Sequence, residues 1–187
     1  MTTRTNTDWI LTYTGQKFYP LDPRPEDVDI RDIAHALSMT RRFNGHVKEF
    51  YSVAQHSVYV ATLMRLWNGD NETCLAALLH DASEAYLNDI VKPVKTSAEF
   101  EFYRKAESRL QAVIAERFNL KPNARIIEAD VQMLKAEAYH LMPEHPDWAL
   151  TTELPEPPFD TYFRCWQPSE ARRKFLMRYT ALAEPVI

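Results

Sequence analysis

The chain has 187 residues, of which 45% are hydrophobic and 12% aromatic, so it is long enough to bury one substantial core and short enough to be a single domain. Three glycines are too few for the many tight turns of an all-β protein, and 26% charged residues suit the surfaces of helices. The 22 Lys and Arg against 26 Asp and Glu leave a net charge of −4. This balance argues against a protein that wraps duplex nucleic acid or binds an anionic membrane.

The cysteines and the N-terminus indicate where the protein works. One cysteine pair, Cys74 and Cys165, in a chain of this length is not a secreted disulfide framework, and it favours a reducing compartment. The stretch from Met1 to Trp9 contains no apolar signal segment, and no later window approaches about eighteen consecutive apolar residues. We therefore expect a soluble, cytoplasmic protein.

The first part of the chain predicts a hairpin and then a helix. β-prone residues on both sides of Thr14-Gly15-Gln16 indicate a small N-terminal β-hairpin. Prolines punctuate the connector that follows, as far as Pro25. Asp29 is placed to cap the first helix, whose apolar residues recur at helical spacing: Ile30, Ile33, Ala34 and Leu37.

A second helix is predicted after Ser52. Ser52 and Gln55 have the spacing of a capping box, in which both side chains satisfy free amides at the start of a helix. Apolar residues then follow His56 at four, seven, eight and eleven positions: Val60, Leu63, Met64 and Trp67. This period places His56 on the buried face of the helix.

A third helix is predicted from Asn71, which follows the break at 68–70 and can cap it. Its apolar side is formed by Cys74, Leu75, Ala77 and Leu78. We expect this helix to continue into His80 and Asp81, so that one buried helix carries both side chains.

Three further helices are predicted. Thr96 and Glu99 form a possible capping box before a long amphipathic helix that ends near Asn119. A following helix has an apolar stripe that adjoins Asp130: Ile127, Val131, Leu134, Ala138 and Leu141. Residues 143–168 are rich in proline and predict a loop, after which Ser169 can cap a last helix. We expect one domain over residues 1–187, with its core at about 30–142 and the proline-rich loop and last helix at 143–187.

Four potential metal ligands fall on the interior faces of separate predicted helices: His56, His80, Asp81 and Asp130. Two neutral imidazoles and two carboxylates suit Mn²⁺, Co²⁺, Fe²⁺, Ni²⁺ or Zn²⁺. Four protein ligands on an octahedral ion leave two positions, for water and a phosphate oxygen. Such a site can hydrolyse a phosphoester.

These residues also carry a family resemblance. The stretch from Ala76 to Lys95, with its His80-Asp81 pair, resembles the signature of the HD-domain phosphohydrolases, in particular the bacterial and phage deoxyribonucleotidase-like branch. His56 upstream and Asp130 downstream complete the H…HD…D pattern of that family. The resemblance covers roughly residues 30–142, and from Ile30 to His56 it is similar to small hydrolases of bacteriophages and prophages. It implies an all-α helical bundle in which these four residues hold one divalent metal ion.

Two acidic residues are candidates for catalysis. Glu84 lies three residues after Asp81 and four after His80, on the same face of a helix, where a carboxyl group can orient or deprotonate water. The resemblance assigns it a catalytic role, and it implies that Asp89 helps to position water, the leaving group or the sugar. No histidine occurs between residues 82 and 129, where dinuclear relatives usually carry two, so we expect a mononuclear site.

A phosphate substrate also needs cations from the protein. The resemblance places Arg42 at the position of a phosphate-contacting arginine, but the spacing to His56 leaves Arg41 as an alternative. Lys92 and Lys95 can each reach a phosphate, and His46 is a further candidate contact.

The sequence predicts a metal-dependent nucleotide phosphohydrolase, specifically a 5′-nucleotidase that releases phosphate from deoxyribonucleoside monophosphates. One alternative is a small HD-type triphosphohydrolase of deoxynucleoside triphosphates, for which Lys135 would be an additional cation. The other is a nucleotide-binding module without catalysis. The expected partner is a small nucleotide, and the resemblance permits a homodimer or a higher homo-oligomer.

Overall fold

The computed structural model describes residues 8–152, 155, 158 and 163–183. These residues form eight α-helices and one two-stranded antiparallel hairpin. The predicted all-α fold with a small N-terminal hairpin is confirmed. The hairpin strands and helices are β1 (Ile10–Leu11), β2 (Lys17–Phe18), α1 (Ile30–Met39), α2 (Val53–Leu66), α3 (Asn71–Leu78), α4 (Glu84–Leu87), α5 (Lys92–Lys95), α6 (Glu101–Arg117), α7 (Arg125–Leu141) and α8 (Pro168–Ala183). Short 3₁₀ turns lie at Pro25–Asp27, Arg42–Gly45, Ala98–Phe100 and Ala149–Thr151.

Two predicted helix starts are confirmed by their caps. The side chain of Asp29 accepts a hydrogen bond from the Arg31 amide at the start of α1, and Ser52 accepts one from the Gln55 amide at the start of α2. The capping box at α2 is wrong in its second half, because the buried Gln55 side chain bonds to the segment before α8 and not to the start of α2. Its Nε2 donates to the carbonyl of Arg164, and its Oε1 accepts from the amide of Trp166. Gln55 therefore ties α2 to the segment that leads into α8.

Three other predicted helix starts are wrong. Asp70, not Asn71, caps α3 by accepting a hydrogen bond from the Thr73 amide. Helix α6 begins at Glu101 with no side-chain cap, so Thr96 and Glu99 form no capping box. Helix α8 already includes Pro168, so Ser169 lies inside it. Proline is favoured at the first position of a helix because its missing amide costs nothing there. Part of the predicted proline-rich loop lies outside the described residues.

The prediction that α3 carries the His-Asp pair is also wrong. The helix ends at Leu78, and His80 and Asp81 lie in the tight turn before α4. The predicted face of α7 is rotated as well, because Ile127 and Val131 are 69% and 48% exposed. Ala138 and Leu141 of the predicted stripe are buried, and the rest of the buried face is formed by Ile126, Ala129, Met133, Ala136 and Glu137.

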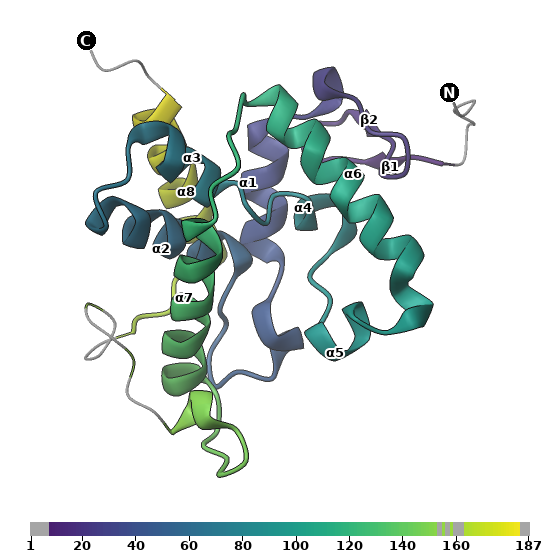
Figure 1. Cartoon of the computed structure of the whole chain (residues 1–187). Helices are drawn as coiled ribbons and strands as arrows, with labels where there is room; N and C mark the ends of the chain where they lie inside the picture. The colour runs from purple at the N-terminus through teal and green to yellow at the C-terminus, as the bar shows by residue number, and fades with distance from the viewer. Residues whose placement is uncertain (1–7, 153–154, 156–157, 159–162, 184–187) are drawn as a thin grey trace.

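Helix α2 lies at the centre of the molecule, in contact with α1, α3, α7 and α8 (Figure 1). Ten of its residues are buried, which explains how a polar side chain such as His56 becomes fully enclosed. Helix α6 lies on the opposite side of α1 from α2 in Figure 1, with Leu110 and Ile114 buried. Its Gln111 side chain forms hydrogen bonds with Leu79 and Ser83 in the turn after α3. Among the described residues, each helix is too short or too polar to span a lipid bilayer.

Candidate metal centre

Two helices and one turn bring the four predicted ligands together. His56 comes from α2, Asp130 comes from α7, and His80 comes from the turn after α3. The His56 Nε2 atom lies 3.1 Å from Asp130 Oδ1 and 3.3 Å from His80 Nε2. One ligand atom from each of these three residues lies within 4.8 Å of the other two, a spacing that could hold a metal ion.

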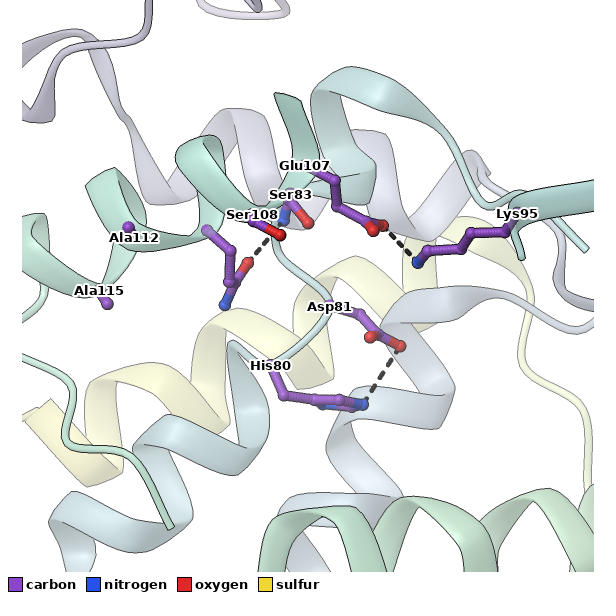
Figure 2. A pocket seen from close by; sticks show the side chains of 9 residues that line it. His80, Asp81, Ser83, Lys95, Glu107, Ser108, Ala112 and Ala115 are labelled. Carbon is purple, nitrogen blue, oxygen red and sulfur yellow. Dashed lines mark hydrogen bonds and ion pairs between the residues drawn. The ribbon is translucent and has the colours of Figure 1, made fainter. Parts of the chain in front are cut away.

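Asp81 faces the same point from the turn. Its Oδ2 atom lies 3.2 Å from His80 Nε2 (Figure 2). The same atom lies 3.5 Å from His56 Nε2. The side chain is 22% exposed, whereas His56 is fully buried. The cluster is therefore closed on the side of α2 and open to solvent on the side of the carboxylates.

The outer nitrogens of both imidazoles have acceptors that fix the rings. His56 Nδ1 lies 2.6 Å from Glu137 Oε1, and His80 Nδ1 lies 2.8 Å from the Ala77 carbonyl oxygen. Since a carboxylate or a carbonyl oxygen can only accept, each neutral ring keeps its proton on Nδ1 and presents the lone pair of Nε2 to the cluster. Two oriented imidazole nitrogens beside two carboxylates are a donor set that fits a divalent transition metal ion.

The pKa shifts of the clustered residues also fit a site for a cation. Burial lowers the pKa of His80, but Asp81 and Asp130 outweigh it and raise that pKa to about 9. The pKa of His56 is likewise raised well above its usual range, because Glu137, Asp130 and Asp81 outweigh burial and the nearby Arg42. Burial raises the pKa of Asp130, but its hydrogen bonds to the two histidines lower it overall. The carboxylates thus demand positive charge, which protons supply when no metal ion does.

Glu137 is a functional residue that the sequence reasoning missed. It is fully buried on α7, seven residues after Asp130, so both side chains lie on one face two turns apart. Its Oε1 accepts hydrogen bonds from Tyr51 Oη at 3.0 Å and from His56, and its Oε2 pairs with Arg42 Nε at 2.9 Å. A glutamate at a position where the helical period demands an apolar residue is the signal that could have found it.

Between the two candidate arginines, the structure brings Arg42 to the cluster and leaves Arg41 exposed. The Arg42 side chain is 13% exposed, and its Nη1 atom lies 3.6 Å from Asp81 Oδ2. Phe43 and Asn44 follow in the left-handed region, with φ of 53° and 52°. Such backbone is costly for a bulky residue and occurs mainly where function requires it.

Glu84 begins α4 and is only 6% exposed, and its Oε2 atom has no hydrogen-bond partner among the described residues. Burial and the negative charges of Asp81 and Asp89 raise the pKa of Glu84 to about 9. Burial also raises the pKa of Asp89, partly opposed by Arg42. In the metal-free protein, burial and the neighbouring carboxylates therefore favour the protonated form of Glu84.

A cavity of about 410 Å³ adjoins His80 and Asp81. Figure 2 shows Lys95 and Glu107 across the cavity from this pair, with Lys95 Nζ 2.5 Å from Glu107 Oε1. Its remaining lining residues are Ser83, Ser108, Gln111, Ala112 and Ala115. Of the other predicted phosphate contacts, Lys92 and His46 are exposed and do not line this cavity.

Comparison with known proteins agrees with this geometry. The HD domain family profile matches residues 53–160, a range that contains all four predicted ligands. The uncharacterized protein YfdR of Escherichia coli K12 is 34% identical over 179 residues, which cover 94% of this chain and 96% of that protein. The uncharacterized protein RCAP_rcc00048 of Rhodobacter capsulatus is 42% identical over 116 residues, which cover 60% of this chain and 59% of that protein.

HD domains are generally metal-dependent hydrolases, and a centre built from His56, His80 and Asp130 could serve that chemistry. The family profile spans more than half of the chain, and the similarity to YfdR extends over nearly the whole length of both proteins. The chain belongs to the HD-domain family.

Proposed function

We propose that the protein is a 5′-nucleotidase, a metal-dependent phosphohydrolase that converts deoxyribonucleoside 5′-monophosphates into deoxynucleosides and phosphate. The observation that carries this proposal is the position of Arg42, whose Nη1 atom lies 3.6 Å from Asp81 while its Nε is held by Glu137. A guanidinium anchored in this way presents its remaining donors to an anion beside the histidine and aspartate cluster.

His56, His80, Asp81 and Asp130 would hold the divalent ion. When bound, such an ion supplies Lewis-acid stabilisation of a phosphoryl oxygen and lowers the pKa of water. Arg42 binds and orients the phosphate from the side of Asp81, and it stabilises the charge that builds up on the phosphoryl oxygens.

Glu84 is suited to the proton transfer that ends the reaction. A general acid must carry its proton at the working pH, and the pKa of Glu84 is raised to about 9. As the oxygen of a water molecule bonds to phosphorus and the bond between phosphorus and the 5′-oxygen breaks, Glu84 donates its proton to the 5′-oxygen. The nucleoside then leaves as an alcohol, and Glu84 regains a proton from the water that attacked. Asp89 shares the electrostatic environment of Glu84 and Arg42, and it helps to orient water or the leaving group.

The charges around the cavity favour a monophosphate over a triphosphate. Among the described residues that line the cavity, Lys95 is the one cation, and Glu107 already neutralises it. Lys92 and Lys135, which a triphosphate would need, are exposed and do not line the cavity. A volume of about 410 Å³ lies within the range of roughly 300–1,000 Å³ that is typical of small-molecule sites.

The test is product-resolved hydrolysis. Metal-stripped protein is supplied with Mn²⁺, Co²⁺ or Mg²⁺ and incubated with ribo- and deoxyribonucleoside mono- and triphosphates, and the products are separated by ion-exchange chromatography. We expect free phosphate and nucleoside from the deoxy monophosphates. Intact triphosphate released from a deoxynucleoside triphosphate would assign the protein to the triphosphohydrolases instead. Nucleotide binding without turnover under all three metals would identify a binding module.

A further inference from the structure

We propose that Gln111 of α6 is the positioning residue that holds the His80–Asp81 turn, and with it two of the four proposed metal ligands, in place. This inference rests on the proposed metal-dependent function, because it concerns the geometry of that centre. Gln111 belongs to neither the His-Asp pattern nor the candidate catalytic residues, and it reaches the turn from a separate helix.

The amide of Gln111 bridges the two ends of the turn. Its Nε2 donates to the Leu79 carbonyl oxygen at 2.8 Å, and its Oε1 accepts from the Ser83 amide at 3.1 Å. These two backbone groups lie directly before His80 and two residues after Asp81. One side chain therefore fixes both the entry and the exit of the segment that carries the ligands.

The turn needs such an anchor because its own hydrogen bonds are local. Ala82 donates to the Leu79 carbonyl oxygen at 3.2 Å, and the Glu84 amide donates to the Asp81 carbonyl oxygen at 3.0 Å. Helix α3 ends at Leu78, so no continuous helix carries the pair. Local bonds set the shape of the turn, and the fully buried side chains of Leu79 and Ala82 pack it on the core. Gln111 adds the polar contact that fixes the backbone on both sides of the two ligands.

Helix α6 is a firm base for this contact. Leu110 and Ile114, which flank Gln111 on the helix, are both fully buried. On the cavity side of α6, Ser108, Ala112 and Ala115 are small and Glu107 pairs with Lys95, whereas Gln111 reaches the turn. Gln111 thus connects the His80–Asp81 turn to a helix whose neighbouring residues are packed in the core.

The chemistry of the bridge requires a primary amide. A carbonyl oxygen needs a donor and a backbone amide needs an acceptor, and the Gln side chain offers both. Glutamate has the same shape, but an ionised carboxylate would place an acceptor against the Leu79 carbonyl oxygen. Methionine preserves the length and removes both bonds. Outer groups that orient metal ligands typically contribute about 10- to 100-fold in metal affinity.

The experiment compares Co²⁺ binding by the metal-stripped full-length chain in four forms: wild type, Gln111→Met, Gln111→Glu and the control Glu116→Met. Glu116 is an exposed residue of α6 that does not line the cavity. Affinity is measured by calorimetric titration, the coordination geometry by the visible absorption of bound Co²⁺, and folding by circular dichroism. We expect Gln111→Met to bind Co²⁺ about 10-fold or more weakly with an altered spectrum, Gln111→Glu to fall between it and wild type, and Glu116→Met to match wild type.

The outcomes separate this inference from the proposed function. If wild type binds no Co²⁺, the proposed metal-dependent function fails. If wild type binds and both Gln111 variants are folded with wild-type affinity and spectrum, the positioning role of Gln111 is overturned while the metal centre stands. If Gln111→Met does not fold, the folded Gln111→Glu variant decides the question, since unchanged Co²⁺ binding would overturn the role and weakened binding would support it.

Discussion

Glu137 Oε1 lies 2.6 Å from His56 Nδ1, in a contact between α7 and α2 that is closed to solvent. The same carboxylate pairs with Arg42, so a single buried group orients a proposed metal ligand and a proposed phosphate contact. This shared partner couples the two halves of the site, because a shift of Glu137 would move both side chains.

Substituting Glu137 tests that coupling. In Glu137→Gln the Arg42 cation loses its buried counter-charge, and breaking a buried pair in this way typically costs about 3 kcal/mol of unfolding free energy. We also expect Mn²⁺ affinity to fall by about 10-fold or more, because His56 loses its orienting carboxylate. Urea denaturation and Mn²⁺ titration measure the two effects. Tyr51→Phe is the matched control, since it removes one hydrogen bond of about 1 kcal/mol, and an unchanged urea midpoint for Glu137→Gln would contradict the account.

The two neighbouring arginines give a paired test of phosphate binding. Arg42→Lys keeps the positive charge but loses the planar fork of donors, whereas Arg41→Lys changes an exposed residue. We expect Arg42→Lys to lower kcat/KM for a deoxynucleoside monophosphate by about 100-fold, and Arg41→Lys to remain close to wild type. Steady-state kinetics at saturating Mn²⁺ measure both, and equal effects of the two substitutions would refute the assignment of Arg42.

The role of Glu84 is tested by removing its proton while keeping its shape. Glu84→Gln cannot protonate the leaving 5′-oxygen, so we expect kcat to fall by about 10²- to 10⁴-fold. Mn²⁺ affinity should stay near that of wild type, since Glu84 is not among the proposed ligands. Single-turnover hydrolysis at saturating substrate separates this loss from weaker binding. A variant with wild-type kcat would exclude Glu84 as the acid.

The raised pKa values predict how stability of the metal-free protein depends on pH. The pKa of His80 rises from 6.5 in its ordinary state to about 9, and that of Glu84 rises from 4.5 to about 9. Both groups bind protons more tightly in the folded state, so their stabilisation is complete at low pH and is lost as the pH rises towards 9. We expect the urea midpoint in the presence of a chelator to fall between pH 6.5 and 9. A midpoint that rises over this range would contradict the assigned electrostatics.

Metal binding should displace protons from His56 and His80. Because the histidines must lose protons to become ligands, Co²⁺ binding at pH 7 is expected to release protons into the buffer and to strengthen as the pH rises. Calorimetric titrations in buffers of different ionisation enthalpy measure the number of protons released. Binding without proton release would show that His56 and His80 are not the ligands.

Much of the fold could be predicted because local signals agree with it. Asp29 and Ser52 cap α1 and α2 as expected, since a cap depends on residues that lie close together in the chain. The prediction for α3 fails at its end, because the helix stops at Leu78 and the chain turns there. Gln111 of α6 forms hydrogen bonds with this turn, a contact that no local pattern reveals. The predicted face of α7 is wrong at Ile127 and Val131, which are apolar but exposed. An apolar side chain alone does not show which face of a helix is buried.

The site could be predicted in part for the same reason. The four proposed ligands follow from residue type and spacing, and the structure brings them together. The helical period could have marked Glu137 as a buried acid, but its partners Tyr51, Arg42 and His56 are remote in the chain and follow only from the structure. Burial also distinguishes Arg42, which lies beside Asp81, from the exposed Arg41, and burial is a property of the folded chain rather than of spacing.

The proposed hydrolysis requires one divalent ion, which the four proposed ligands would hold. Its most direct test is the release of phosphate from a deoxynucleoside monophosphate by metal-stripped protein, as Mn²⁺ is added in increments to wild type and to Asp81→Asn. The account predicts that wild-type activity is absent with chelator and reaches its plateau at about one bound ion per chain, and that Asp81→Asn stays nearly inactive throughout. Full activity in the chelated protein, or unchanged hydrolysis by Asp81→Asn, would contradict it.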